Sequence, residues 1–366
     1  MRRVLHVIGK MDRAGAETLI MNIYRKIDRE KIQFDFLVFT NEKGDYDDEI
    51  VSLGGKIYRL PKFAGYNYGI FYRKFKCFFS EQKYEIVHGH IGSLAPLYLS
   101  IAKKTGAYTI AHSHASKSNK LINRVIFSLF SFRVRYIADY FFACSKQAGI
   151  DRFGERIVSS RKFSLLKNGI DSDLYIYSNE RHNELKEKFG LNNKIVYGHV
   201  GRFSEEKNHN FLLEVFAQIC KKDSDSVLIL VGRGPEEKTI QNKILMMGLE
   251  RKVVFLGVRN DIPDLMNLFD VFIFPSFYEG LGIVGIEAQA AGLPCFFSQA
   301  IPNEAIITDN VFKCDLGLGA EAWADYILKS IDKYERKNTN YQIKDNGYDI
   351  MGISVELMNF YIEKCK

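Results

Sequence analysis

The chain has 366 residues, of which 46% are hydrophobic and 26% charged, and its formal net charge is +7. This length suggests two globular domains, each with a real hydrophobic core. The moderate positive charge suits an anionic ligand, a nucleic acid or an anionic membrane, whereas no uncharged stretch is long enough to span a bilayer.

The six cysteines are scattered, with no Cys-x-x-Cys pair and no histidine at the spacing of a zinc site. Several of them lie in or beside apolar runs, as small core residues do, which suits a reducing compartment. The apolar run at the N-terminus is too short for a signal peptide and is interrupted by His6, so it fits a first β-strand better. We therefore expect a cytoplasmic protein that can touch a membrane.

Apolar runs of strand length alternate with helical patterns in the first half of the chain. The expected strands are "RVLHVIG", "FDFLVFT", "KIYRL", "EIVHGH", "YTIAHSH" and "YFFACS". Helical patterns such as "ETLIMNIYRKI" and "LAPLYLSIAKKTG" lie between several of them.

The second half repeats this alternation with the strands "KIVYGHVGR", "SVLILVGRG", "KVVFLGV", "VFIFPS" and "PCFFSQ". The pattern predicts an α/β fold with two parallel sheets, each wound with helices. A polar stretch without a strand places the boundary near residues 168–185, and a helix at 354–366 follows the completed second sheet.

Ligands of open parallel sheets bind beyond the C-terminal ends of the strands. Six loops are expected there: Gly9–Glu17, His88–His90, His112–His114, Gly201–Lys207, Gly232–Gly234 and Glu279–Gly282. Two such sheets facing each other would form one cleft.

The stretch "SFYEGLGIVGIEAQAAGLP" places a glycine-rich loop between a strand and a helix. Its glycines leave N–H groups uncovered at a helix N-terminus, where phosphate binds readily. Glu279 and Glu287 are eight residues apart, too far for an i,i+4 pair, so we expect them to have different roles. In isolation a plain turn followed by an acidic helix start is the favoured interpretation of such a loop, so the rest of the chain has to decide.

Two cations, Arg202 and Lys207, follow a strand and precede a helix, where they could hold a diphosphate. The alternative is two solvated surface cations. "LVGRGPEEK" has Glu237 where a dinucleotide fingerprint needs a third glycine, so an oxidoreductase is not supported. Two "DSD" stretches read as polar loops, and we expect no bound metal.

His112 and His114 lie two residues apart at a strand end and therefore on one side of an extended segment. His88 and His90 repeat this spacing on the preceding strand. A metal site built from these four residues is conceivable but has no carboxylate beside it.

The segment 117–135 has five basic residues, no acidic residue and many aromatic ones. Lys117, Lys120 and Arg124, with the aromatic residues Phe127 and Phe130, give it a basic amphipathic character that fits an anionic membrane surface. A core helix with a solvated basic face is an almost equal alternative.

Taken together, these motifs resemble the retaining glycosyltransferases of the GT-B fold, family 4 (group 1), of the polysaccharide-assembly type. The similarity covers nearly the whole chain, and its most specific element is Glu-x7-Glu, here Glu279 to Glu287. "GHVGRFSEEKN", "LVGRGP", "LLKNGID" and "DRAGAETLIMN" are also similar. The last usually reads Gly-Gly-Ala-Glu, and Ala14 replaces its first glycine, so only Gly15 is carried over.

The resemblance implies a donor site in the second domain. It assigns the diphosphate or donor sugar to Gly280, Leu281 and Gly282, the sugar hydroxyls to Glu279, and the ribose to Glu287. It likewise assigns the diphosphate to Arg202 and Lys207, and the base to the neighbourhood of Val258 and Arg259. The active-site histidine is most simply His112, with His114 as the competing assignment.

The implied architecture is two Rossmann-like domains, 1–170 for the acceptor and 171–348 for the nucleotide sugar, with a helix at 349–366 crossing back to the first domain. The implied activity is retaining transfer from a UDP- or GDP-linked sugar to a hydroxyl of a lipid-linked glycan, for capsule, exopolysaccharide or lipopolysaccharide synthesis. We expect no metal, no cofactor and no nucleic-acid partner, and a place on the cytoplasmic face of an anionic membrane. The alternatives are an epimerase, a phosphorylase or a non-catalytic nucleotide-sugar-binding protein.

Overall fold

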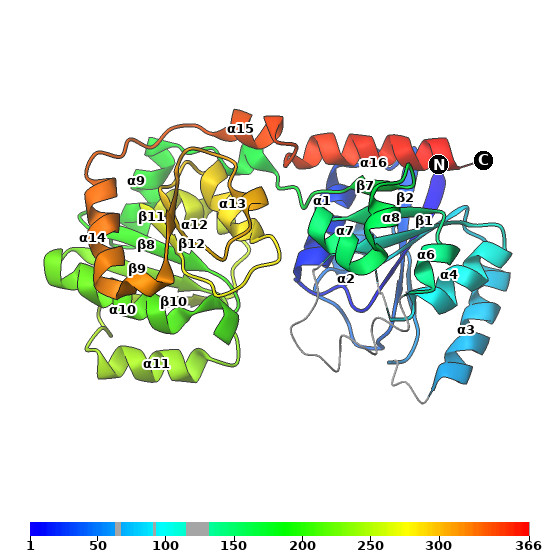
Figure 1. Cartoon of the computed structure of the whole chain (residues 1–366), viewed down its shortest axis with the longest axis horizontal. Coiled ribbons are helices and arrows are strands. Elements are labelled where there is room, and N and C mark those ends of the chain that lie inside the picture. Colours follow the sequence, from blue (N-terminus) through cyan, green and yellow to red (C-terminus); the bar gives the residue numbers. More distant parts are fainter. Residues whose placement is uncertain (63–66, 91–92, 115–131, 366) are drawn as a thin grey trace. The chain divides into compact units, whose positions relative to one another are not determined.

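The computed structural model describes residues 1–62, 67–90, 93–114 and 132–365. The chain divides into two compact units, each built on its own sheet (Figure 1). Unit 1 comprises residues 1–170 and 347–366, and unit 2 comprises residues 171–346.

The sheet of unit 1 has the strand order β3-β2-β1-β4-β5-β6-β7, with every pair parallel. The strands are β1 Arg2–Ile8, β2 Ile32–Val38, β3 Ile57–Arg59, β4 Ile86–Gly89, β5 Tyr108–Ser113, β6 Tyr140–Ala143 and β7 Phe163–Leu165. The six expected strands are present, and the three-residue edge strand β7 is an addition that the sequence did not predict.

Helices cover both faces of this sheet. They are α1 Gly15–Lys26, α2 Asp47–Ser52, α3 Tyr68–Glu81, α4 Ala95–Lys104, α6 Val134–Ile137, α7 Lys146–Phe153, α8 Glu155–Val158 and α16 Ile350–Lys364. Alternate side chains of a strand point to opposite faces. Val4 and Ile8 of β1 accordingly pack in one core with α1 and α16, while Leu5 and Val7 pack in the other with α3 and α4.

The C-terminal helix α16 belongs to unit 1 although it follows unit 2 in the chain, which confirms the expected crossing back. Its N-terminus is capped by Asp349, whose side chain accepts hydrogen bonds from the N–H groups of the first turn. Ile350, Ile353 and Leu357 are buried against α1 and the strands. Near its end, Tyr361 is completely buried and its hydroxyl lies 2.6 Å from Nδ1 of His88 on β4.

The sheet of unit 2 has the order β10-β9-β8-β11-β12-β13, again with all pairs parallel. The strands are β8 Ile195–Val200, β9 Ser226–Val231, β10 Val253–Gly257, β11 Val271–Phe274, β12 Cys295–Ser298 and β13 Val311–Cys314. The edge strand β13 was not predicted.

The α-helices of unit 2 are α9 Asn179–Lys188, α10 His209–Lys222, α11 Glu237–Met246, α12 Ile262–Leu268, α13 Ile283–Ala290, α14 Gly319–Ile331 and α15 Asn340–Asp345. The 3-10 helices of unit 2 are η1 Ser172–Tyr175, η2 Glu205–Lys207, η3 Asn303–Ala305 and η4 Leu316–Leu318.

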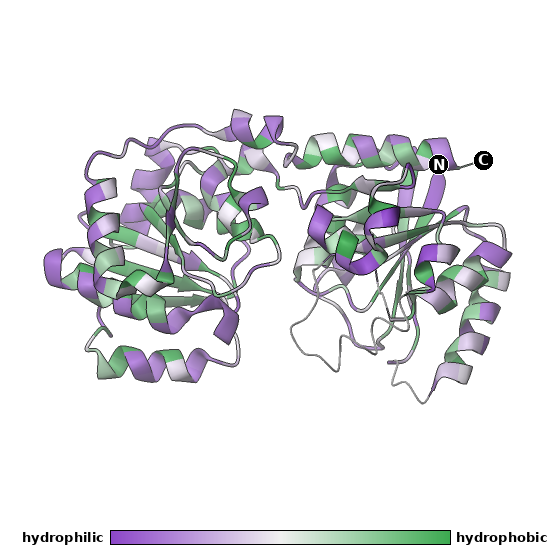
Figure 2. Ribbon diagram, viewed as in Figure 1, coloured by the Kyte–Doolittle hydropathy of each residue, from purple (hydrophilic) through white to green (hydrophobic). Residues whose placement is uncertain are grey.

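Hydrophobic residues are frequent on the strands of each unit, and the helices carry both hydrophobic and hydrophilic residues (Figure 2). Within the described ranges, no helix combines the length and the apolar character that crossing a bilayer requires.

Candidate active site

Two loops meet at the carboxyl-terminal edge of the unit 2 sheet. We call residues 201–208 the β8 loop and residues 275–282 the β11 loop, after the paired strands that they follow. The Phe277 N–H donates to the carbonyl of Glu206 at 2.8 Å, and the Asn208 side-chain amide donates to the carbonyl of Pro275 at 3.1 Å. These two hydrogen bonds join the loops, so their side chains keep a defined arrangement relative to one another.

An ion pair joins the two loops. Lys207 Nζ lies 2.5 Å from Glu279 Oε1, and the Ser276 hydroxyl donates to the same oxygen at 2.7 Å. The exposed fractions of the two charged side chains are 15% and 9%. The Lys207 ammonium group also lies 5.0 Å from the centre of the Phe274 ring. The sequence predicted separate roles for Lys207 and Glu279 and did not predict their contact or the part of Ser276.

The structure corrects the plain interpretation of Glu279 as the cap of the following helix. The N-cap of α13 is Gly282, and no side chain caps this helix. Gly282 has φ +76°, and a Cβ there would lie 2.9 Å from Phe274, so glycine suits both the backbone and the space. Gly280 is exposed, and Leu281 buries its side chain. The first turn of α13 thus keeps N–H groups free of side-chain acceptors, as an anion-binding helix N-terminus requires.

The second glutamate of the motif, Glu287, lies one turn into α13, as its assignment to a ribose would need. Burial raises the pKa of its carboxyl group to about 7, while a hydrogen bond with Tyr175 acts in the opposite direction. Burial and the neighbouring Glu287 raise the pKa of the Tyr175 hydroxyl well above 10. Tyr175 comes from η1, more than a hundred positions earlier, in a polar stretch whose sequence gave no sign of this contact.

The remaining predicted donor residues lie on the same edge of unit 2. Arg202 is exposed on the β8 loop. Val258, just after β10, has 52% of its surface exposed, while its neighbour Arg259 is paired with Asp261 at 2.5 Å.

The loop after β9 packs against the β8 loop through backbone atoms. Gly232 has φ +135°, and a Cβ on it would lie 1.9 Å from the Gly201 carbonyl oxygen. A Cβ on Gly234 would lie 2.1 Å from the Phe203 carbonyl oxygen. The glycines of "LVGRGP" therefore serve close loop packing in this structure, which explains why they occur without the rest of a dinucleotide fingerprint.

In unit 1, five histidines gather on one face of the sheet near the ends of β1, β4 and β5, and we call them the histidine cluster. Its members are His6, His88, His90, His112 and His114. His6 Nδ1 lies 3.0 Å from His90 Nε2, and His90 Nδ1 lies 2.7 Å from His114 Nε2. The rings of His112 and His114 are 3.9 Å apart between centres, so both competing candidates for the active-site histidine share one place.

Burial keeps the histidine cluster uncharged. Burial, and after it the nearby His114, lower the pKa of His6 to about 3. Burial lowers the pKa of His114 to about 4. Burial, followed by the neighbouring histidines, holds the pKa values of His88, His90 and His112 well below 6.5. These side chains are therefore neutral imidazoles at pH 7 and can act as hydrogen-bonding groups or bases.

The other predicted residues of unit 1 lie apart from these contacts. Gly15 begins α1, and no atom lies within 4 Å of the position that a Cβ on it would take. Lys117, Lys120 and Arg124 lie outside the described residues. At the described end of the basic segment, Arg133 and Tyr136 are exposed, while Arg135 lies over the ring of Phe132 at 5.1 Å.

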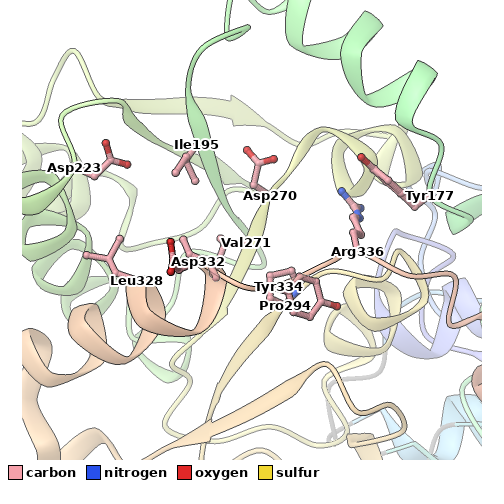
Figure 3. A pocket seen from close by; sticks show the side chains of 11 residues that line it. Tyr177, Ile195, Asp223, Asp270, Val271, Pro294, Leu328, Asp332, Tyr334 and Arg336 are labelled. Atoms are coloured by element: carbon pink, nitrogen blue, oxygen red, sulfur yellow. The ribbon is translucent and has the colours of Figure 1, made fainter.

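A cavity of about 460 Å³ lies at the opposite, amino-terminal edge of the unit 2 sheet (Figure 3). It is lined by residues at the starts of β8, β11 and β12, with Asp270, Tyr177 and Arg336 beside them. Arg336 donates hydrogen bonds to the carbonyls of Met266, Phe269 and Ala291, which is a structural role. Since ligands of parallel sheets bind at the carboxyl-terminal edge, the β8 and β11 loops are a better candidate site than this cavity.

Both parts of the chain match glycosyltransferase families. Residues 181–349 match the model of glycosyl transferases group 1, and residues 13–174 match that of glycosyltransferase family 4. EpsF of Bacillus subtilis, described as a glycosyltransferase, is 34% identical over 378 residues, which cover 98% of this chain and 96% of EpsF. An Escherichia coli UDP-Gal:alpha-D-GlcNAc-diphosphoundecaprenol alpha-1,3-galactosyltransferase is 30% identical over 240 residues, covering 62% of this chain and 61% of that enzyme.

Among solved structures, HepE of Anabaena in complex with UDP-glucose superposes with a TM-score of 0.81, at 20% identity, over 99% of this chain and 100% of HepE. This likeness extends to the whole GT-B architecture. With matches to both halves and a relative of 34% identity over almost the full length, the chain belongs to the group 1 (family 4) glycosyltransferases of the GT-B fold.

Proposed function

We propose that this glycosyltransferase moves a sugar from a nucleotide diphosphate sugar to an acceptor hydroxyl and retains the anomeric configuration. The observation that carries the proposal is the Lys207–Glu279 pair beside the uncapped N-terminus of α13. This arrangement offers a cation and N–H groups to a diphosphate, and a carboxylate to sugar hydroxyls, within one small region.

The proposed chemistry follows from the charges that develop as the bond to the donor sugar breaks. Negative charge grows on the diphosphate, where Lys207, Arg202 and the N–H groups of Gly280, Leu281 and Gly282 stabilise it. Positive charge grows on the sugar ring near Glu279. The acceptor attacks the face from which the diphosphate departs, and the departing phosphate takes the acceptor proton. No protein carboxylate is assigned as a nucleophile.

Glu287 is proposed to accept hydrogen bonds from the ribose hydroxyls, and Val258 to contact the base. Gly15 is placed on the donor side of unit 1, and His112, or His114 in its place, beside the reacting hydroxyl. Transfer is proposed to need no divalent metal or cofactor. In support, Asp173 is paired with Lys344 at 2.8 Å, and Asp225 with Lys194 at 2.6 Å, so one aspartate of each "DSD" stretch already has a lysine partner.

The donor is proposed to be a UDP- or GDP-sugar, and the acceptor a lipid-linked glycan in polysaccharide synthesis. The Escherichia coli relative is named for a diphosphoundecaprenol-linked acceptor, and HepE was solved with UDP-glucose. We place the protein on the cytoplasmic face of an anionic membrane, with Lys117, Lys120 and Arg124 toward the lipid or the acceptor.

The test is a panel of UDP- and GDP-sugars, scored by thermal stabilisation and by turnover with and without a lipid-linked acceptor, in excess EDTA. One donor should stabilise the protein and be consumed with acceptor, and the anomer of the product should match that of the donor. Consumption of the donor without acceptor would indicate an epimerase or phosphorylase, and binding without turnover a non-catalytic protein. Activity restored only by Mg²⁺ or Mn²⁺ would contradict the metal-free mechanism.

A further inference from the structure

The histidine cluster contains more buried nitrogen atoms than its hydrogen bonds use. Among the described residues, His6 Nε2, His88 Nε2, His114 Nδ1 and both ring nitrogens of His112 are buried and have no hydrogen-bond partner. Buried polar atoms are nearly always paired, so a group of such atoms in one place indicates a missing ligand, either water or an ion.

A small cavity lies where such a ligand would fit. Its volume is about 10 Å³, and His6, His88, His90 and His112 line it together with apolar side chains of α1, β2 and α16 and with Leu166. This is about the space of a single water molecule or metal ion. His114 does not line it.

Three of these histidines have the spacing of a metal site. His6, His88 and His90 each offer a ring nitrogen, and the three atoms lie within 4.8 Å of one another. Nitrogens bound to a tetrahedral ion at 2.0–2.1 Å stand about 3.3 Å apart, and His6 Nδ1 and His90 Nε2 are already 3.0 Å apart. Small ring movements would bring them to an ion.

Outer contacts orient two of the three rings. His88 Nδ1 lies 2.6 Å from the Tyr361 hydroxyl, and His90 Nδ1 lies 2.7 Å from His114 Nε2. At His88 the contact engages Nδ1 and leaves Nε2 without a hydrogen-bond partner, whereas Nε2 of His90 faces Nδ1 of His6 and would turn from that contact to an ion. Metal-binding histidines are characteristically held by such a partner on the other ring nitrogen.

We propose that His6, His88 and His90 form a site for a first-row transition metal ion such as Zn²⁺. Three neutral imidazoles with a fourth position for water are an established zinc ligand set. The same set has no oxygen ligand among the described residues, so it discriminates against Mg²⁺ and Ca²⁺, which prefer oxygen. The site is separate from the donor contacts of unit 2, and it does not rest on the proposed transfer reaction.

The test uses full-length, tag-free protein stripped with chelator, then titrated with Zn²⁺, Co²⁺ and Mg²⁺. We expect about one Zn²⁺ or Co²⁺ per chain by elemental analysis, visible absorption of bound Co²⁺, and no binding of Mg²⁺. His6→Gln and His88→Gln should each weaken binding by about 100-fold. His182→Gln, the same change in unit 2, should leave it within about 2-fold.

A milder variant keeps the test decisive if the glutamine variants fail to fold. Tyr361→Phe removes only the hydroxyl that orients His88 and should weaken Co²⁺ binding by about 10- to 100-fold. Wild-type protein that binds neither Zn²⁺ nor Co²⁺ would overturn the proposal, and so would binding that is unchanged in Tyr361→Phe and His88→Gln. Binding lost in His114→Gln but kept in His6→Gln and His88→Gln would overturn the assignment of the three ligands.

Discussion

The carboxyl-terminal edges of the two sheets carry polar groups of opposite character. In unit 2 the edge is ionic, with the Lys207–Glu279 pair and the carboxyl group of Glu287. In unit 1 the edge is a buried histidine cluster with lowered pKa values. One parallel-sheet architecture thus supports a charged edge, suited to a diphosphate, and a neutral edge, suited to hydroxyl groups or a soft metal ion. The side chains on the last residues of the strands, on the loops that follow and on the helices after them decide between the two.

The largest expected effect comes from breaking the charged edge. Lys207→Ala should lower kcat/KM roughly 30- to 1,000-fold, because a charge-assisted contact to phosphate is lost. This factor corresponds to a loss of about 2–4 kcal/mol of transition-state stabilisation. Steady-state kinetics with the donor identified in the panel measure this. Lys243→Ala is the matched control, since Lys243 is also paired with a glutamate, Glu214, at 2.7 Å, but on helices α10 and α11. Equal kcat/KM in the two variants would show that Lys207 does not bind the diphosphate of the donor.

Glu279→Gln should lower kcat by about 100-fold and change the KM for the donor little. The amide keeps the shape but loses the charge near the flattening sugar ring, while Lys207 remains free to bind the diphosphate. Kinetics and a melting curve on the same preparation check this, with Glu214→Gln as the control for loss of an ion-paired carboxylate. A lower Tm with unchanged kcat would mean that Glu279 serves folding alone.

The donor KM should depend on pH through Glu287, and the histidine cluster of unit 1 should not contribute to this dependence. With a pKa of about 7 in the free protein, its carboxylate forms as pH rises and, in the proposed donor complex, would then accept hydrogen bonds from the ribose. The donor KM should therefore fall by about 10-fold between pH 6 and 8 in the wild type. Glu287→Gln should have a raised, pH-independent KM. All eight histidines have lowered pKa values, so a dependence that survives in this variant would contradict the assignment.

The protonation of Glu287 should also affect the stability of the fold. A rise in pH that improves donor binding should lower the free energy of unfolding. Between its unfolded pKa of 4.5 and its folded pKa of about 7, the folded state holds a proton that the unfolded chain has released. The free energy of unfolding therefore falls as pH rises through this window. Glu287→Gln should raise the Tm at pH 8, by roughly 2–4 °C for each kcal/mol recovered, and leave the Tm at pH 5 unchanged.

The smallest effect concerns the basic segment of unit 1. Each cation near an anionic membrane contributes about 1 kcal/mol, so Lys120→Gln should lower binding to anionic vesicles by about 5-fold at low salt. Vesicle co-sedimentation measures this, with Lys243→Gln as the control. Equal binding to neutral and anionic vesicles that does not change with salt would contradict the proposal that this segment binds an anionic membrane.

Sequence patterns predicted the architecture well because long apolar runs dominate both sheets. The missed strands β7 and β13 are edge strands of three and four residues, and "FSL" and "VFKC" are too short to show an alternation. The motif around Glu279 and Glu287 predicted where the polar edge lies, but not its contacts. Tyr175 lies next to Glu287 only because the chain folds back between η1 and α13, and such a meeting leaves no local signal.

The position of α16 has a consequence for how the protein is made. The ribosome synthesises the residues of this helix after all of unit 2, yet they complete the core of unit 1. Until then, the nascent first unit exposes the apolar face of α1 and β2 on which α16 packs, Phe34 among its residues, and an exposed face of this kind favours aggregation. A fragment that ends at residue 170 would keep that face open permanently. The first half of this protein to be translated is therefore the last to finish folding.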